Sequence, residues 1–153
     1  MLNGRSGLCA AALVIVALLW AGALIGVSWI ATPVKFAAPS LTLPVALDVG
    51  RVTFHLFNRI EWGLAVLLLI VTFIHRTRGG LSLLAAVVIG ILVLLQAVWL
   101  LPLLDERVAI VIAGGTPPAS SLHLWYIVIE AVKLVLLLAI GLIGLFRRPA
   151  TMP

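Results

Sequence analysis

The sequence predicts an all-α fold, an integral membrane bundle of four helices that run up, down, up and down, with both termini on the inner side. The first observation is composition: of 153 residues, 64% are hydrophobic and 10% are charged, against about 45–50% apolar and about 25% charged in soluble domains. The mean hydropathy is +1.32. The second observation is that four apolar stretches each reach the roughly 20 residues needed to cross a hydrocarbon core. A single transmembrane domain over 1–153 follows, which excludes a soluble catalytic domain, a nucleic-acid module and a dinucleotide-binding fold.

The first helix is expected over residues 7–30. Its apolar run is longer than the roughly 7–15 residues of a secretory signal, so we expect a retained helix. Residues 31–44 contain three prolines, which break helices and favour extended neighbours, and they are predicted to form an outer loop. The second helix is expected over 45–75, because Pro44 suits a first helical turn.

The third helix is expected over residues 81–104, entered through a Gly-Gly turn and closed near Pro102. A second outer loop over 105–121 follows, with an apolar segment too short to cross the membrane and expected at the interface. The fourth helix is expected over 122–146, where Ser120 or Ser121 can cap its first turn.

Basic residues predict the orientation. Five of them fall on the side that holds the N-terminus, and three fall on the other side together with acidic residues, which favours both termini inside. The five are Arg5, Arg76, Arg78, Arg147 and Arg148, and the three are Lys35, Arg51 and Arg107. Since the net charge of +5 is spread along the flanks of apolar runs, we expect a lipid bilayer as partner, no nucleic acid, and a bacterial inner membrane.

Ionisable residues within the predicted spans are costly and normally face a bundle interior. Helical periodicity places two sets of polar side chains on stripes. The stripe on the fourth helix is His123, Tyr126, Glu130 and Lys133, and the stripe on the second helix is His55, Asn58, Arg59 and Trp62. Glu61 lies about 160° from Arg59 around the second helix.

Three of the predicted helices place a polar residue at the same depth in the membrane. Arg59, Gln96 and Glu130 each lie eight residues from an outer helix end, or roughly 12 Å at the helical rise of about 1.5 Å per residue. The sequence therefore predicts a buried Arg59–Glu130 pair with Gln96 beside it, and places Glu61 within reach of Lys133. Two interpretations stay open: a structural ion pair that sets helix register, or a polar cavity, open to the outer side, for a small ligand, proton or metal.

No cofactor and no metal site is predicted. Cys9 is the only cysteine, so neither a disulfide within the chain nor a cysteine metal cage can form. His75 falls in a basic turn where a solvated role is expected. His55 and His123 lie in the outer half and could bind haem, or one of them could bind a quinone together with Asn58 or Tyr126.

Small and aromatic residues complete the predicted packing. Gly90, Gly141 and Gly144 allow helices to approach closely. The indoles of Trp29, Trp99 and Trp125 fall near the outer interface, as in an aromatic belt.

Several of these features carry a resemblance over residues 15–145. The first helix runs into Pro33-Val34-Lys35-Phe36, the second has an entry containing phenylalanine, and the fourth carries His123 and then Glu130. The chain resembles the family of small four-helix membrane proteins that includes transmembrane protein 205 and uncharacterised bacterial members. It departs from them in the full polar set HLFNRIEW of its second helix, and the resemblance implies no established activity.

The leading functional expectation is non-enzymatic. A buried polar layer in the outer half would bind a small solute, or the bundle would serve as an accessory subunit of a larger membrane complex or associate with itself. The alternative is a redox subunit that binds haem or quinone through His55 and His123.

Overall fold

The computed structural model describes residues 2–74 and 80–146, and the side chains of residues 2–6 are outside that description. Within these ranges all regular secondary structure is helical, and four helices are long and apolar enough to cross a membrane. The basic residues Arg76, Arg78, Arg147 and Arg148, and also His75, lie outside the described residues.

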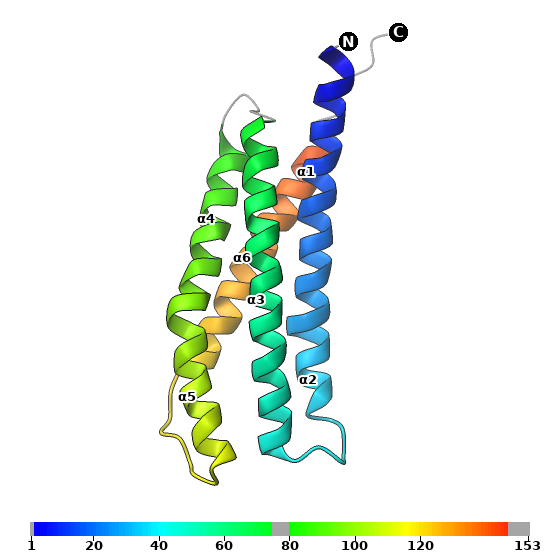
Figure 1. The fold of residues 1–153 in the computed structure, drawn as a ribbon. Helices are drawn as coiled ribbons and strands as arrows, with labels where there is room; N and C mark the ends of the chain where they lie inside the picture. Colours follow the sequence, from blue (N-terminus) through cyan, green and yellow to red (C-terminus); the bar gives the residue numbers. More distant parts are fainter. Residues whose placement is uncertain (1, 75–79, 147–153) are drawn as a thin grey trace.

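Four continuous rods make up the molecule (Figure 1). They are α1 (Leu2–Leu24) with η1 (Ile25–Ala31) and α2 (Thr32–Lys35), then α3 (Leu43–Ile74), then α4 (Leu81–Leu95) with η2 (Gln96–Leu100) and α5 (Leu101–Ile112), and finally α6 (Leu122–Phe146). The segments η1 and η2 are π-helical.

The predicted four-helix membrane bundle is confirmed. Successive rods run in opposite directions, and the start of α1 and the end of α6 lie at one end of the bundle (Figure 1). α1 packs against α3 and α6, and α4 packs against α3 and α6, so the four rods close into a ring. Which end faces the inside of the cell stays a prediction.

Two helices extend further than the sequence predicted. The first span continues to Lys35 instead of ending at 30, and the third continues to Ile112 instead of ending at 104, so the apolar segment expected at the interface is largely helical. Proline normally interrupts a helix because it lacks an N–H and collides with the carbonyl four residues before it. Here a wider π turn comes first: the N–H of Thr32 donates to the Val27 carbonyl, and that of Leu101 donates to the Gln96 carbonyl. This i→i+5 spacing carries the helix into Pro33 and Pro102.

The end of the bundle near the chain termini is closely packed, and we call it the closed half. Its core includes Ala17, Leu68, Ile89 and Leu137, all buried. A Cβ placed on Gly141 would lie 2.6 Å from Leu18 Cδ2, and one placed on Gly144 would lie 2.6 Å from Val14 Cγ2. α1 and α6 therefore meet here at a distance that only glycine allows. Gly90, in contrast, makes only ordinary contact with Leu69.

The opposite end, formed by η1, α2, the first turns of α3, η2, α5 and the first turns of α6, is called the open half. Its buried apolar cluster is small and consists of Leu100, Leu101, Tyr126 and Ile129. The side chains that matter for function lie in this half and at its border with the closed half.

Candidate functional site

A group of hydrogen-bonded polar side chains crosses the bundle at the border between the two halves, and we call it the polar cluster. All four rods contribute to it. Its members are Trp20, Ser28, Glu61, Gln96, Glu130 and Lys133. Glu61, Gln96 and Lys133 are 0% exposed and Glu130 is 1% exposed, whereas Ser28 is partly buried, so the charged side chains of the cluster lie in the interior of the bundle.

Lys133 is at its centre. The ammonium lies 2.6 Å from Glu61 Oε1, 2.7 Å from Gln96 Oε1 and 2.6 Å from Glu130 Oε1. The first two of these contacts are hydrogen bonds that the ammonium donates, and the third is an ion pair. Lys133 therefore ties α3 and η2 to α6.

The two carboxylates differ in their remaining contacts. Glu130 Oε1 also accepts a hydrogen bond of 2.7 Å from Gln96 Nε2, and its Oε2 accepts one of 2.9 Å from Ser28 Oγ. Glu61 Oε1 accepts a further bond of 3.1 Å from Trp20 Nε1. Glu61 Oε2 is buried and has no partner among the described residues.

The polar cluster has an unequal charge count. With both carboxylates ionised it carries two negative charges and one positive charge, a formal net charge of −1. Burial of an unbalanced charge in low dielectric is costly. Either a proton on one of the carboxyl groups or an additional positive charge beside the cluster would remove this imbalance.

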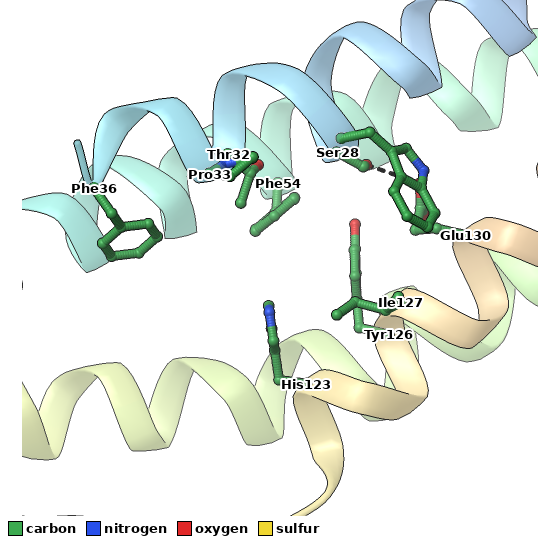
Figure 2. A pocket seen from close by; sticks show the side chains of 10 residues that line it. Ser28, Thr32, Pro33, Phe36, Phe54, His123, Tyr126, Ile127 and Glu130 are labelled. Atoms are coloured by element: carbon green, nitrogen blue, oxygen red, sulfur yellow. Dashed lines mark hydrogen bonds between the residues drawn. The ribbon is translucent and has the colours of Figure 1, made fainter. Parts of the chain in front are cut away.

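A cavity of about 310 Å³ lies next to the cluster, between η1 with α2 on one side and the first turns of α6 on the other (Figure 2). It is lined by Ser28, Trp29, Thr32, Pro33, Phe36, Phe54, His123, Tyr126, Ile127 and Glu130. Because Ser28 and Glu130 belong to both the cavity and the polar cluster, the Glu130 carboxylate connects the two.

Three polar groups of α6 line the cavity on one helical face. Figure 2 shows His123 and Tyr126 pointing from α6 toward the opposite helix, with Glu130 one turn further on. The Tyr126 ring packs against Phe54, with centroids 4.9 Å apart. Neither the Tyr126 hydroxyl nor the His123 ring has a hydrogen-bond partner among the described residues, so both are free to bind a ligand.

A smaller cavity of about 110 Å³ adjoins the first and shares Thr32, Phe36, Phe54 and His123 with it. Lys35 lies at this second cavity, and its Nζ is 5.1 Å from the centroid of the Phe36 ring and 5.6 Å from that of Phe54. The ammonium occupies the space that a Cβ on Gly50 would need. Two rings that line the larger cavity thus already bind an ammonium group of the chain itself.

The predicted Arg59–Glu130 pair is wrong. Arg59 is exposed on the outer surface of α3 and has no ion pair among the described residues. The inward face of α3 consists of Glu61, Ala65, Leu68 and Thr72, and Arg59 lies on the far side because two residues turn a helix by about 200°. Glu61 takes the inward position and contacts Lys133, as predicted.

The other predicted residues separate into two groups. Asn58 is buried and its Nδ2 donates a bond of 3.4 Å to the Val93 carbonyl, outside the cluster. His55 lies 2.6 Å from Asp105 and is away from the cavity, whereas His123 lines it. The described residues contain no group of three His, Cys, Asp or Glu side chains that could hold a metal ion.

Two members of the polar cluster were missed. Trp20 and Ser28 belong to the first span, which carries no ionisable residue over its apolar core, so nothing in its pattern indicated a polar role. The available signal was the indole and hydroxyl donors themselves, since a buried tryptophan N–H normally finds an acceptor. Asp105 was missed as the partner of His55 because it was assigned to a loop.

Comparison with known families identifies the scaffold. Residues 15–109 match the model of a family described as Domain of unknown function (DUF4149). The chain belongs to this family. The match runs from α1 to α5 and thus includes Trp20, Ser28, Glu61 and Gln96, whereas α6, with Glu130 and Lys133, follows it. No curated protein and no solved structure matches the chain.

Proposed function

We propose that this membrane protein binds a small solute in the cavity of the open half and performs no catalysis. The observation that supports this is the cavity of about 310 Å³, which is walled by apolar and aromatic side chains and presents His123, Tyr126 and Glu130 on one side. Ligand sites in proteins are typically of this size, largely apolar, with a few polar groups that set orientation.

The polar cluster has a supporting role in this proposal. Its hydrogen bonds join all four rods beside the cavity and use contacts of 2.6–3.1 Å. Bonds from Ser28 and Gln96 hold Glu130 in place beside the cavity. A ligand therefore meets a preformed site, which lowers the entropy cost of binding.

The test uses two matched variants. Thr32 lines the cavity and Thr53 does not, and each donates its hydroxyl to a backbone carbonyl of its own helix. Thr32→Phe should fill the cavity, and Thr53→Phe should not. We expect a small molecule that copurifies from native membranes, identified by mass spectrometry, to be lost from Thr32→Phe alone. Equal retention by both variants would contradict the proposal.

A second candidate function is that of an accessory subunit or self-associating protein. Arg59 is exposed on a membrane-spanning helix without a partner among the described residues, and a groove of about 240 Å³ between α3 and α4 lies beside it at Trp62. A partner helix with a carboxylate at this depth would neutralise the arginine. Native mass analysis after gentle extraction should then show a complex that Arg59→Gln weakens and Arg51→Gln does not.

A quinone is a competing occupant of the same cavity, because His123 and Tyr126 could donate to its carbonyls. An absorption spectrum and solvent extraction of the purified protein test this version. Haem ligation through both histidines is less well supported, since His55 is paired with Asp105.

Two further assignments belong to the same proposal. We propose a bacterial inner membrane as the location, with the open half outward, from the distribution of basic residues. We also propose a relationship to the family that includes transmembrane protein 205, supported by Pro33-Val34-Lys35-Phe36 and by the His123 and Glu130 pattern of α6.

A further inference from the structure

We propose that the ligand of the larger cavity is an organic ammonium ion, a small primary or quaternary amine whose positive charge lies against Glu130. This inference rests on the proposed solute-binding function and specifies the chemical class of the solute. Three observations support it, and they concern charge, aromatic walls and the position of Lys35.

The first observation is charge. Glu130 lines the cavity, and its Oε2 accepts one hydrogen bond among the described residues, from Ser28, which also lines the cavity. A carboxylate oxygen can accept more than one hydrogen bond. With both carboxylates ionised, the cluster carries a formal charge of −1, because Lys133 is shared between them. A cation in the cavity would balance this charge, as would a proton on one of the carboxyl groups.

The second observation is the composition of the cavity walls. Four of the ten lining side chains are aromatic: Trp29, Phe36, Phe54 and Tyr126. Aromatic faces attract ammonium groups, and sites that enclose such groups in proteins combine several rings. Rings together with a carboxylate favour an organic cation over a neutral solute, and they oppose an anion.

The third observation concerns two of these rings. The Lys35 ammonium lies between Phe36 and Phe54, at 5.1 and 5.6 Å from the ring centroids, and it has no ion pair among the described residues. These rings also line the larger cavity. The chain thus shows that this aromatic surface holds an ammonium in the absence of a carboxylate partner, and Lys35 would compete with a ligand for it.

The ammonium could belong to a free solute or to the headgroup of a phospholipid such as phosphatidylethanolamine. Both sources present the same chemistry to Glu130 and the aromatic rings. A free amine would bind in detergent without lipid. A headgroup would be retained as whole lipid during purification.

The experiment compares choline with 3,3-dimethylbutan-1-ol, its neutral isostere, by isothermal titration calorimetry in a non-ionic detergent. We expect choline to bind at least about tenfold more tightly, as a desolvated cation–π contact assisted by a carboxylate allows. Lys35→Met should tighten choline binding about threefold, because it removes the competing ammonium from both rings. A purely structural role for Lys35 would not produce a gain.

Two tryptophan variants provide the matched control. Trp29→Leu removes an aromatic wall of the cavity, and Trp125→Leu changes an exposed indole of α6 that does not line it. We expect the first to weaken choline binding about tenfold with little effect on the isostere, and the second to leave both unchanged. Because Glu130→Gln could disturb the polar cluster, its loss of choline binding counts only if its melting temperature stays near that of the wild type.

Native mass spectrometry distinguishes the two sources. Retained phosphatidylethanolamine that is lost in Trp29→Leu supports a headgroup ligand, and choline binding without retained lipid supports a free solute. Equal affinity for choline and its isostere, both blocked by Thr32→Phe, would overturn the ammonium inference and leave the solute site standing. If neither choline nor any copurified molecule depends on Thr32, both proposals fail.

Discussion

Near the chain termini, Gly141 and Gly144 of α6 approach Leu18 and Val14 of α1 so closely that a Cβ has no room. At the other end of the same two rods, Phe36 and His123 face each other across a cavity of about 310 Å³ (Figure 2). The same two rods thus pack closely in one half of the bundle and leave a cavity between them in the other.

The difference follows from which residues lie between the rods. In the closed half, glycines face aliphatic side chains, and membrane helices associate tightly through such small residues. In the open half, the rods contain the π-helical segments η1 and η2, which are often found at functional sites. Each π segment contributes a polar side chain, Ser28 or Gln96, to Glu130. The polar cluster therefore marks the boundary between a structural half and a binding half.

The largest expected effect on stability comes from a substitution in the polar cluster at that boundary. Lys133→Met leaves Glu61 and Glu130 buried without their cation, and loss of one partner of a buried ion pair generally costs about 3–5 kcal/mol. We expect the free energy of unfolding in detergent to fall by that amount. Arg59→Met is the control, since the exposed arginine should change stability by less than about 0.5 kcal/mol. A comparable loss in both variants would contradict the assignment of Lys133 to the interior and Arg59 to the surface.

A smaller loss of stability is expected from a substitution that overpacks the closed half. In Gly141→Ala the new methyl group meets Leu18, and overpacking of this kind typically costs about 1–3 kcal/mol. Thermal unfolding in detergent measures the change. Gly63→Ala, where a Cβ meets nothing within 4 Å, should be neutral or stabilising by about 0.5–1 kcal/mol through helix propensity. A stable Gly141→Ala protein would show that the two halves are packed alike.

Removal of one hydrogen bond at the boundary should cost less again. Trp20→Phe removes the N–H that donates to Glu61 Oε1 together with part of the fully buried indole. Hydrogen bonds between membrane helices contribute about 0.6 and at most about 1.7 kcal/mol, so we expect at least that loss, with an added cost for the space left by the smaller ring, by the same unfolding measurement. Trp99→Phe, an exposed indole on η2, is the matched control. A loss as large as that of Lys133→Met would mean that Trp20 supports packing beyond this bond.

Much of the architecture was predictable because a span of a lipid bilayer needs a long apolar segment, and such segments are visible in the sequence. The four spans and their alternation follow from the length of the apolar segments and from short connections, such as that between Ile74 and Leu81. The ends of the first and third spans were not predictable in the same way, since Pro33 and Pro102 act as breakers unless a π turn precedes them, and no residue type specifies a π turn.

The candidate site was predictable in part. The stripe of α6 could be derived from helical periodicity, and the structure places Tyr126, Glu130 and Lys133 in the interior and the exposed His123 at the cavity. On α3, periodicity separated Arg59 from Glu61 but could not select which one faces inward. That choice depends on the packing of Ala65, Leu68 and Thr72 against the other rods, which a single helix does not reveal.

The smallest expected effect is at Gly50, which compares directly with Gly141. A Cβ at either glycine collides with a neighbour, but at Gly50 the neighbour is the flexible end of Lys35. The ammonium can move into the adjoining cavity, and the lost cation–π contact, worth about 0.5–1 kcal/mol at exposed sites, is offset by a similar gain in helix propensity. We therefore expect Gly50→Ala to change the free energy of unfolding by less than about 0.5 kcal/mol. A loss of stability equal to that of Gly141→Ala would show that the open half is as tightly packed as the closed half.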